Sequence, residues 1–240
     1  MPDVGTTGTP DARTIDAGRA VEWFVSGWQT FLRDPGVWIA ISVILFVAVF
    51  ALSLIPLIGQ IAVLTMLPIA GGGLVLGCKA LGEGGELRVE HLLEGFRQRG
   101  AELAIVGALY AVGGLLAIGT AVLIGSGGAI GGAISQGWPG VGMAAGGFAL
   151  GALVYFALSI LLGMAVWFAP ALVVLRGVAP LDAMQASLSG CIRNFVPFGV
   201  VSGLAAICGF LAMLPAGLGI VVFAPVMVGA AYASYLDVFA

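Results

Sequence analysis

The residues of this chain that could do chemistry gather in one acidic segment around its sole histidine, His91. A zinc site needs three or four ligands, and Glu90 and Glu94 do not complete one with His91. The segment alternates acidic and basic residues, which is typical of a solvated helix face and leaves divalent-cation binding as an alternative. Its charged members are Glu83, Glu86, Arg88, Glu90, Glu94, Arg97, Arg99 and Glu102. We predict no metal site and no cofactor.

Nucleophilic chemistry has little support in the sequence. The three cysteines, Cys78, Cys191 and Cys208, are odd in number and lack C-x-x-C spacing, so we expect them to act as small apolar packing residues. No Ser-His-Asp or Cys-His combination is evident, and the triplet Gly71, Gly72 and Gly73 lacks the strand and the Lys-Ser/Thr of a phosphate-binding loop. We predict a protein that is not an enzyme.

The composition favours a membrane protein. Apolar residues make up 60% of the 240 residues and charged residues only 9%, with a mean hydropathy of +1.14. Soluble proteins carry roughly 25% charged residues. The nine basic residues form no basic stripe, which argues against nucleic acid as a partner.

Three charge-free tracts predict about six transmembrane helices, since crossing about 30 Å of hydrocarbon takes about 20 apolar residues. Proline and glycine divide the tracts near Pro56 and Pro215. The predicted spans are 37–57, 61–78, 103–124, 143–168, 195–214 and 220–236. Between the third and fourth, the glycine-rich segment 125–142 is expected to form an extracytoplasmic loop, with an amphipathic or re-entrant piece as the alternative. Residues 1–13 are expected to form a short disordered cytoplasmic tail.

The charges also predict an orientation. With six spans, all nine basic residues fall on one side of the membrane, which the positive-inside rule places in the cytoplasm together with both termini. We therefore predict a multi-pass protein of the bacterial inner membrane. No span carries an ionisable residue near its centre. Proteins that couple transport to protons or carry charged solutes usually have such residues within their spans, so the sequence argues against both functions.

Three amphipathic helices are expected on the cytoplasmic side, one before each pair of spans, which makes the fold class an all-α polytopic bundle. Trp23, Trp28 and Trp38 suit an aromatic belt at that interface. The predicted apolar stripes are Val21, Phe24, Val25, Trp28, Phe31 and Leu32; Val89, Leu92, Leu93 and Phe96; and Leu181, Met184, Leu188, Cys191, Ile192 and Phe195.

The chain is expected to form one membrane domain, residues 14–240, and a hypothesis divides it into three helix-plus-hairpin units, 14–79, 80–177 and 178–240. Units one and three share several features at corresponding places, which is compatible with a parallel repeat. The matching pairs are Ser26-Gly27 with Ser189-Gly190, Pro35 with Pro197, Pro56 with Pro215, Pro68 with Pro225, and Gly71 with Gly229.

Two sets of candidate functional residues follow. Small-xxx-small spacings such as Gly128…Gly132 and Gly147…Gly151 indicate close helix packing, and the sharper alternative is a flexible gate. The candidate helix-break or gate positions are Pro68, Gly71, Pro170, Pro225 and Gly229. The candidate interfacial contacts are Phe24, Trp28, Phe31, Trp38 and Phe96.

The stretch from Trp167 to Gly177, the segment Ala183 to Asn194, and the residues Gly27, Trp28, Phe31, Pro35 and Trp38 together resemble a family of uncharacterised proteobacterial inner-membrane proteins. More distantly they resemble the six-span membrane region found beside some glycerophosphodiester phosphodiesterases. The resemblance implies a multi-span helical fold and supplies no activity or binding residues.

Two functional hypotheses remain. The first is a non-enzymatic protein that associates with membrane lipid, with other membrane proteins or with itself. The second is a permease or channel for a small neutral or apolar solute.

Overall fold

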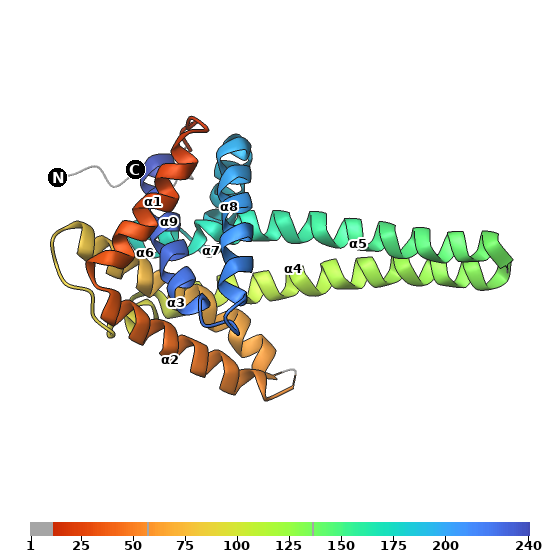
Figure 1. The fold of residues 1–240 in the computed structure, drawn as a ribbon, viewed down its shortest axis with the longest axis horizontal. Coiled ribbons are helices and arrows are strands. Elements are labelled where there is room, and N and C mark those ends of the chain that lie inside the picture. The colour runs from red at the N-terminus through yellow and green to blue at the C-terminus, as the bar shows by residue number, and fades with distance from the viewer. Residues whose placement is uncertain (1–11, 57, 136) are drawn as a thin grey trace.

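The protein is an all-α polytopic helix bundle, as the sequence predicts. A computed structural model describes residues 12–56, 58–135 and 137–240 (Figure 1), and these contain helices and no strands. Six helical stretches in this part of the chain are long and apolar enough to cross a membrane. They are α2 (Pro35–Ser53), α3 (Ile58–Gly82), α4 (His91–Ser135), α5 (Gly137–Trp167) with α6 (Ala169–Arg176), α8 (Phe195–Met213) and α9 (Ile220–Phe239).

Shorter amphipathic helices precede the spans. They are α1 (Arg19–Arg33), α7 (Pro180–Arg193) and the first two turns of α4, which end in a kink at Arg99 with φ −143° and ψ 35°. Proline stands in the first turn of α7, as expected, because a missing N–H costs nothing there. The α6–α7 connection begins at Gly177, whose φ of 66° is a conformation that glycine adopts without strain.

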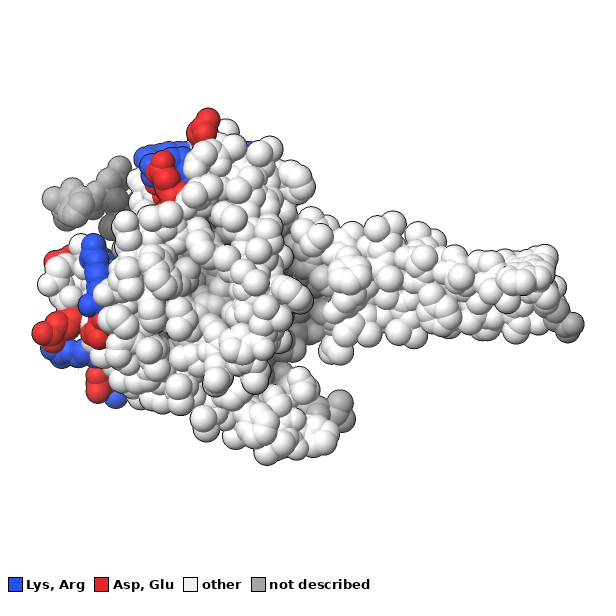
Figure 2. All heavy atoms as spheres, viewed as in Figure 1, with Lys and Arg blue, Asp and Glu red and all other residues white. Residues whose placement is uncertain are grey.

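The molecule has a body and an arm (Figure 1). The arm is the antiparallel pair formed by the C-terminal part of α4 and the N-terminal part of α5, and it projects away from the other helices, which form the body. Charged side chains cluster along the left and upper edges of the body, which we call the charged end of the molecule, while the visible face of the arm is free of charge (Figure 2). This agrees with the segregation of charge that the sequence predicts.

The expectation of a loop at 125–142 is wrong. The described part of this segment is helical: α4 continues to Ser135 and α5 begins at Gly137, while Gln136 lies outside the described residues. The physical reason is close packing of small residues. A Cβ atom added at Gly128 would lie 2.5 Å from the Cα of Gly147, and one added at Gly132 would lie 2.4 Å from the carbonyl oxygen of Gly140.

The contact continues toward the body, where a Cβ atom at Gly151 would lie 2.7 Å from the oxygen of Ala121. Two helix backbones can touch along such a face, which is how small residues associate helices in a membrane. The predicted close packing at Gly128, Gly132, Gly147 and Gly151 is therefore present, but it extends two helices through the segment expected to be a loop.

Two amphipathic helices dock on returning spans through the same glycine contact. A Cβ atom at Gly27 of α1 would lie 2.2 Å from the oxygen of Val226 in α9, the residue after Pro225. A Cβ atom at Gly95 of α4 would lie 2.1 Å from the oxygen of Ile69 in α3, the residue after Pro68. Pro68 and Pro225, which the sequence pairs as equivalent, thus stand beside equivalent docking contacts. The hypothesis of a repeat remains a prediction.

Most of the predicted apolar stripe of α1 stays exposed, and the helix packs on the body through another face. Its buried residues are Ala20, Trp23, Gly27 and Phe31, whereas Val21, Val25, Trp28 and Leu32 are exposed. Both sets recur at helical spacing, and the helix docks through the set that contains a glycine because only that face lets α1 approach α9. Trp23 and Trp38 lie in the core, which differs from the aromatic belt expected of them.

The described chain begins in contact with its own C-terminus. The N–H of Arg13 donates to the carbonyl of Val238 at 2.9 Å, and Ala12 is buried. Asn194, at the start of α8, accepts from the N–H of Ile15 at 2.7 Å and donates to the carbonyl of Arg13. Ala12 and Arg13, which we assigned to the tail, are thus packed, while residues 1–11 of that tail and Leu57 of the first span lie outside the described residues.

Candidate functional site: an apolar cavity between α2, α3 and α9

A cavity of about 330 Å³ lies between α2, α3 and α9. Its size falls at the lower end of the roughly 300–1,000 Å³ range of small-molecule sites. The buried residues of α2, namely Trp38, Ile41 and Ser42, all line it. The remaining lining residues are Leu45, Phe46 and Val49 of α2, Leu67, Ala70, Gly71 and Leu74 of α3, and Ile220, Val221, Ala224, Pro225 and Val228 of α9.

The cavity is closed at the charged end of the molecule and open at its side. Trp38 closes the first end: it is fully buried, and its indole N–H donates to the carbonyl of Thr30 at 3.1 Å. Phe46 and Leu67 are lining residues that are 57% and 47% exposed, so the cavity reaches the outer surface of the bundle. The body is visibly hollowed on the face shown in Figure 2. In a bilayer this opening would face hydrocarbon.

Proline and glycine create this space between α3 and α9. Gly71 contributes no side chain, and a Cβ atom added there would approach nothing closer than Pro170, at 4.0 Å. Pro225 lacks the N–H that would bond to the carbonyl of Val221 one turn earlier, and both residues line the cavity. The carbonyl of Val221 therefore lacks its usual helical donor.

Ser42 carries the sole polar side chain among the described lining residues apart from the indole N–H of Trp38, which is already bonded. It is 8% exposed, and no hydrogen bond of its hydroxyl is found within the described chain. The other buried polar side chains behave differently. Ser187 donates to the carbonyl of Met164, Ser234 donates to that of Ala231, and Asn194 is bonded as described above.

The structure separates the five candidate gate positions. Gly71 and Pro225 line the cavity, and Pro170, at the start of α6, lies behind Gly71. Pro68 is buried within α3 beside the docking contact of Gly95. Gly229 lies outside the cavity, because a Cβ atom there would meet the Cα of Gly27 at 2.8 Å. Gly71 and Pro225 are thus brought together, and Gly229 serves helix docking.

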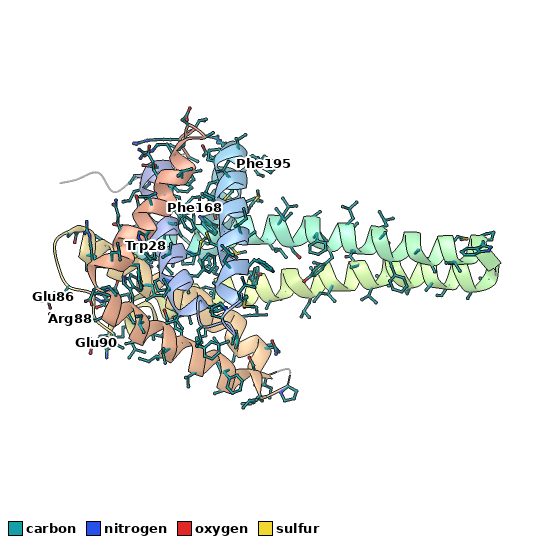
Figure 3. The ribbon with its side chains drawn as sticks, in the orientation of Figure 1. Trp28, Glu86, Arg88, Glu90, Phe168 and Phe195 are labelled. Atoms are coloured by element: carbon teal, nitrogen blue, oxygen red, sulfur yellow. The ribbon has the colours of Figure 1, made fainter. Side chains whose placement is uncertain are left out.

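The five candidate interfacial residues also differ in exposure. Trp28 and Phe96 are 45% and 48% exposed, and Trp28 stands on α1 (Figure 3). Phe24 is half-buried, while Phe31 and Trp38 are buried against α3 and α9. Phe31 and Trp38 cannot touch lipid, because both are part of a buried core cluster near the charged end of the molecule.

The segment around His91 forms a small polar hollow at the charged end of the body (Figure 3). Glu86, Arg88 and Glu90 line it together with His91 and Glu94, so it holds charges of both signs. The N–H of Arg88 donates to the Nδ1 atom of His91 at 2.9 Å, which engages that ring nitrogen in the first turn of α4.

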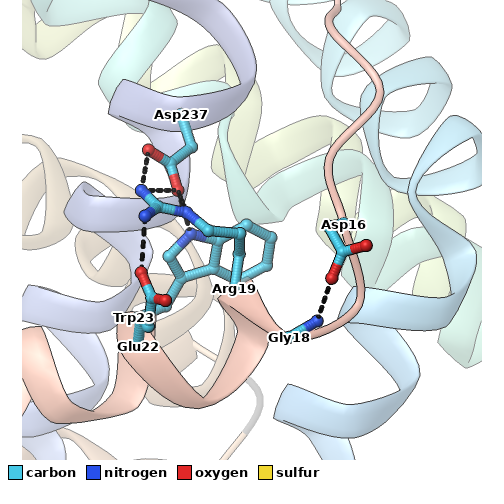
Figure 4. Close-up of polar contacts among 6 residues, drawn as sticks. All are labelled: Asp16, Gly18, Arg19, Glu22, Trp23 and Asp237. Atoms are coloured by element: carbon cyan, nitrogen blue, oxygen red, sulfur yellow. Dashed lines mark hydrogen bonds and ion pairs between the residues drawn. The ribbon is translucent and has the colours of Figure 1, made fainter.

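A polar cluster fixes the register of α1 on α9 (Figure 4). The guanidinium of Arg19 contacts both carboxylate oxygens of Asp237, at 2.7 Å for the closer one, and the indole N–H of Trp23 donates to Asp237 at 2.6 Å. The hydrogen bond and charge of Asp237 raise the pKa of Arg19. Because α1 continues into α2 through Asp34, this register also positions Trp38 at the cavity.

Sequence reasoning missed Ser42 and Val221 as cavity residues. Ser42 is one of several hydroxyl residues in the spans, and nothing in its neighbours marks it. The sequence marks Pro225 as a candidate helix-break position, but it could not show that Pro225 and Val221 line a cavity, since the walls come from helices far apart in the sequence.

Comparison with known proteins finds similarity to an inner membrane protein. The chain is 27% identical over 193 residues to a probable inner membrane protein of Burkholderia thailandensis. The aligned region covers 78% of this chain and 72% of that protein. The name of this relative states no enzymatic activity. The chain matches no protein-family model and no solved structure. The similarity agrees with an inner-membrane protein, and nothing found links the chain to the membrane region of glycerophosphodiester phosphodiesterases.

Proposed function

We propose that this protein is a non-enzymatic inner-membrane protein that holds the apolar chain of a membrane lipid between α2, α3 and α9. The observation that carries the proposal is the lateral cavity, whose lining is almost wholly apolar and whose rim is exposed where lipid would lie. Apolar surface of this kind favours an apolar occupant. The occupant would enter sideways from the bilayer, since Trp38 closes the charged end.

In this proposal the charged end of the body, with both termini, lies in the cytoplasm. The charge segregation seen in Figure 2 and the positive-inside rule support this orientation. The exposed stripe of α1, which contains Trp28, would then contact lipid near the cytoplasmic surface, and Phe96 would do so at the start of α4.

The test is photolabelling in lipid nanodiscs. A diazirine-bearing alkane is incorporated into the disc, and mass spectrometry counts the adducts on α2, α3 and α9. Gly71→Leu fills the cavity and is expected to reduce adducts there severalfold. Gly203→Leu is the matched control, since a Cβ atom at this exposed position of α8 meets nothing within 4 Å. Wild-type labelling of the cavity that persists unchanged in Gly71→Leu, at equal helix content, would refute the proposal.

A permease for a small neutral or apolar solute is the second candidate. It is favoured by one observation, the presence of the two helix-weakening residues Gly71 and Pro225 in the cavity wall. It predicts solute flux across proteoliposomes that falls in Gly71→Leu and not in Gly203→Leu. Lipid holding predicts photolabelling with no flux, so the flux measurement on the wild-type protein separates the two functions.

A further inference from the structure

The hydroxyl of Ser42 is the feature of the cavity that an apolar chain alone leaves unexplained. In α-helices within membranes, serine and threonine hydroxyls ordinarily bond to the carbonyl one turn earlier. Thr30, Ser53, Thr65 and Thr120 do so at 2.7–2.8 Å, bonding to Ser26, Val49, Ile61 and Leu116. In the described chain Ser159 and Ser202 make no such bond, but they are half-buried and exposed, respectively. Ser42 makes no such bond to Trp38 although it is only 8% exposed, which sets it apart from these other hydroxyls.

The oxygen of Ser42 is also not sealed inside the protein. In the described chain no fully enclosed side-chain nitrogen or oxygen lacks a partner, so this unbonded oxygen must remain accessible, and Ser42 lines the cavity. A hydroxyl without a partner in an apolar setting costs free energy, which a partner in the cavity would recover.

We infer that the occupant of the cavity is a neutral lipid whose apolar chain carries one hydroxyl group, and that Ser42 binds this hydroxyl. The inference rests on the proposed function. The occupant is neutral because no described lining residue is charged. It carries a hydroxyl, which can donate as well as accept, because the Val221 carbonyl beside Pro225 offers an acceptor and Ser42 offers a donor.

A second cavity supplies the internal reference. It measures about 310 Å³ at the base of the arm and is lined by Gly113, Leu116, Ala117, Thr120, Leu158, Leu161, Leu162, Ala165 and Leu188. It also holds one hydroxyl residue, but Thr120 already bonds to the carbonyl of Leu116 at 2.8 Å. The two cavities thus match in size and apolar character and differ in whether the hydroxyl is free.

The experiment compares two photoreactive probes in nanodiscs, dodecane and 1-dodecanol, each with a diazirine at the middle of the chain. The alcohol-to-alkane labelling ratio at α2, α3 and α9 is divided by the same ratio at the second cavity, which cancels differences in partitioning. The wild-type quotient is expected to be roughly two- to tenfold, the range that one neutral hydrogen bond gives. Ser42→Ala should bring it to about one, and Thr120→Ala should leave it raised.

A wild-type quotient near one, or a raised quotient that survives in Ser42→Ala, would overturn the inference. Ser42→Ala removes no hydrogen bond of the described fold, so loss of folding does not confound the result. If both probes label the cavity equally, the proposed function stands and the hydroxyl assignment falls. If neither probe labels it, both fall together.

Discussion

The arm and the α2–α3–α9 region are built from the same kinds of residue and pack in opposite ways. In the arm, glycines face glycines, as Gly128 faces Gly147, and the two backbones touch. Between α3 and α9, Gly71 and Pro225 line a cavity, and a Cβ atom added at Gly71 would approach nothing closer than Pro170, at 4.0 Å. The pairing of small residues across a contact, and not their number, therefore decides whether two apolar helices close together or leave a cavity.

The largest effect should come from breaking the arm at Gly147. In Gly147→Leu the new side chain must enter the space held by the Cα of Gly128, and we expect a loss of at least about 3 kcal/mol of unfolding free energy. Unfolding in mixtures of SDS and mild detergent measures it. The adjacent Gly146→Leu is the control, because nothing lies within 4 Å of its Cβ position. Equal stability of the two variants would contradict the packing described for the arm.

A smaller difference in unfolding free energy is expected between substitutions at Gly73 and at Gly71, two glycines of the triplet in α3. In Gly73→Ala the methyl group would lie 2.2 Å from the backbone oxygen of His91, and we expect a loss of about 1–3 kcal/mol. In Gly71→Ala the methyl group would approach nothing closer than Pro170, at 4.0 Å, and stability should hold or rise by up to about 1 kcal/mol, the helix preference of alanine over glycine. The same unfolding assay applies. The comparison between the two regions fails if Gly71→Ala is the more damaging change.

The smallest effect is expected within the arm itself, at Gly131. The Cβ atom of Gly131→Ala would lie 2.8 Å from the terminal methyl of Met143, and this flexible side chain can move aside. We expect a change below about 0.5 kcal/mol, the range of changes away from critical contacts. A loss as large as that of Gly147→Leu would show that side chains, and not backbone contact, hold the arm together.

Much of the fold could be predicted because charge and hydrophobic length are properties of single segments. The charge-free tracts give the six spans, and Pro180 marks the start of α7. The segment 125–142 was misjudged because glycine in soluble proteins signals a turn. Its spacing carried the correct signal: Gly125, Gly128 and Gly132 lie on one helix face, as do Gly140, Gly147 and Gly151.

The site was less predictable because it depends on which faces of distant segments meet. Helix α1 has two apolar faces, and a periodicity argument weighs both equally; only the docking of Gly27 on α9 decides between them. Gly71 and Pro225 could be marked as unusual, but their approach across about 150 residues of sequence depends on tertiary packing. Ser42 is distinguished only by tertiary packing, which buries it at the cavity without a hydrogen-bond partner in the described chain.

The length of the arm has a consequence for the membrane around it. Helix α5 has 31 residues, which at 1.5 Å each is about 46 Å, with Trp138 and Trp167 near its two ends. A hydrocarbon layer is about 30 Å thick. Including the interfacial layers, where tryptophan rings reside, a bilayer is about 40–45 Å thick, so a tilted α5 would reach from one interface to the other. Hydrophobic mismatch would then be smallest in a thick bilayer, and thicker membrane regions should favour this arm.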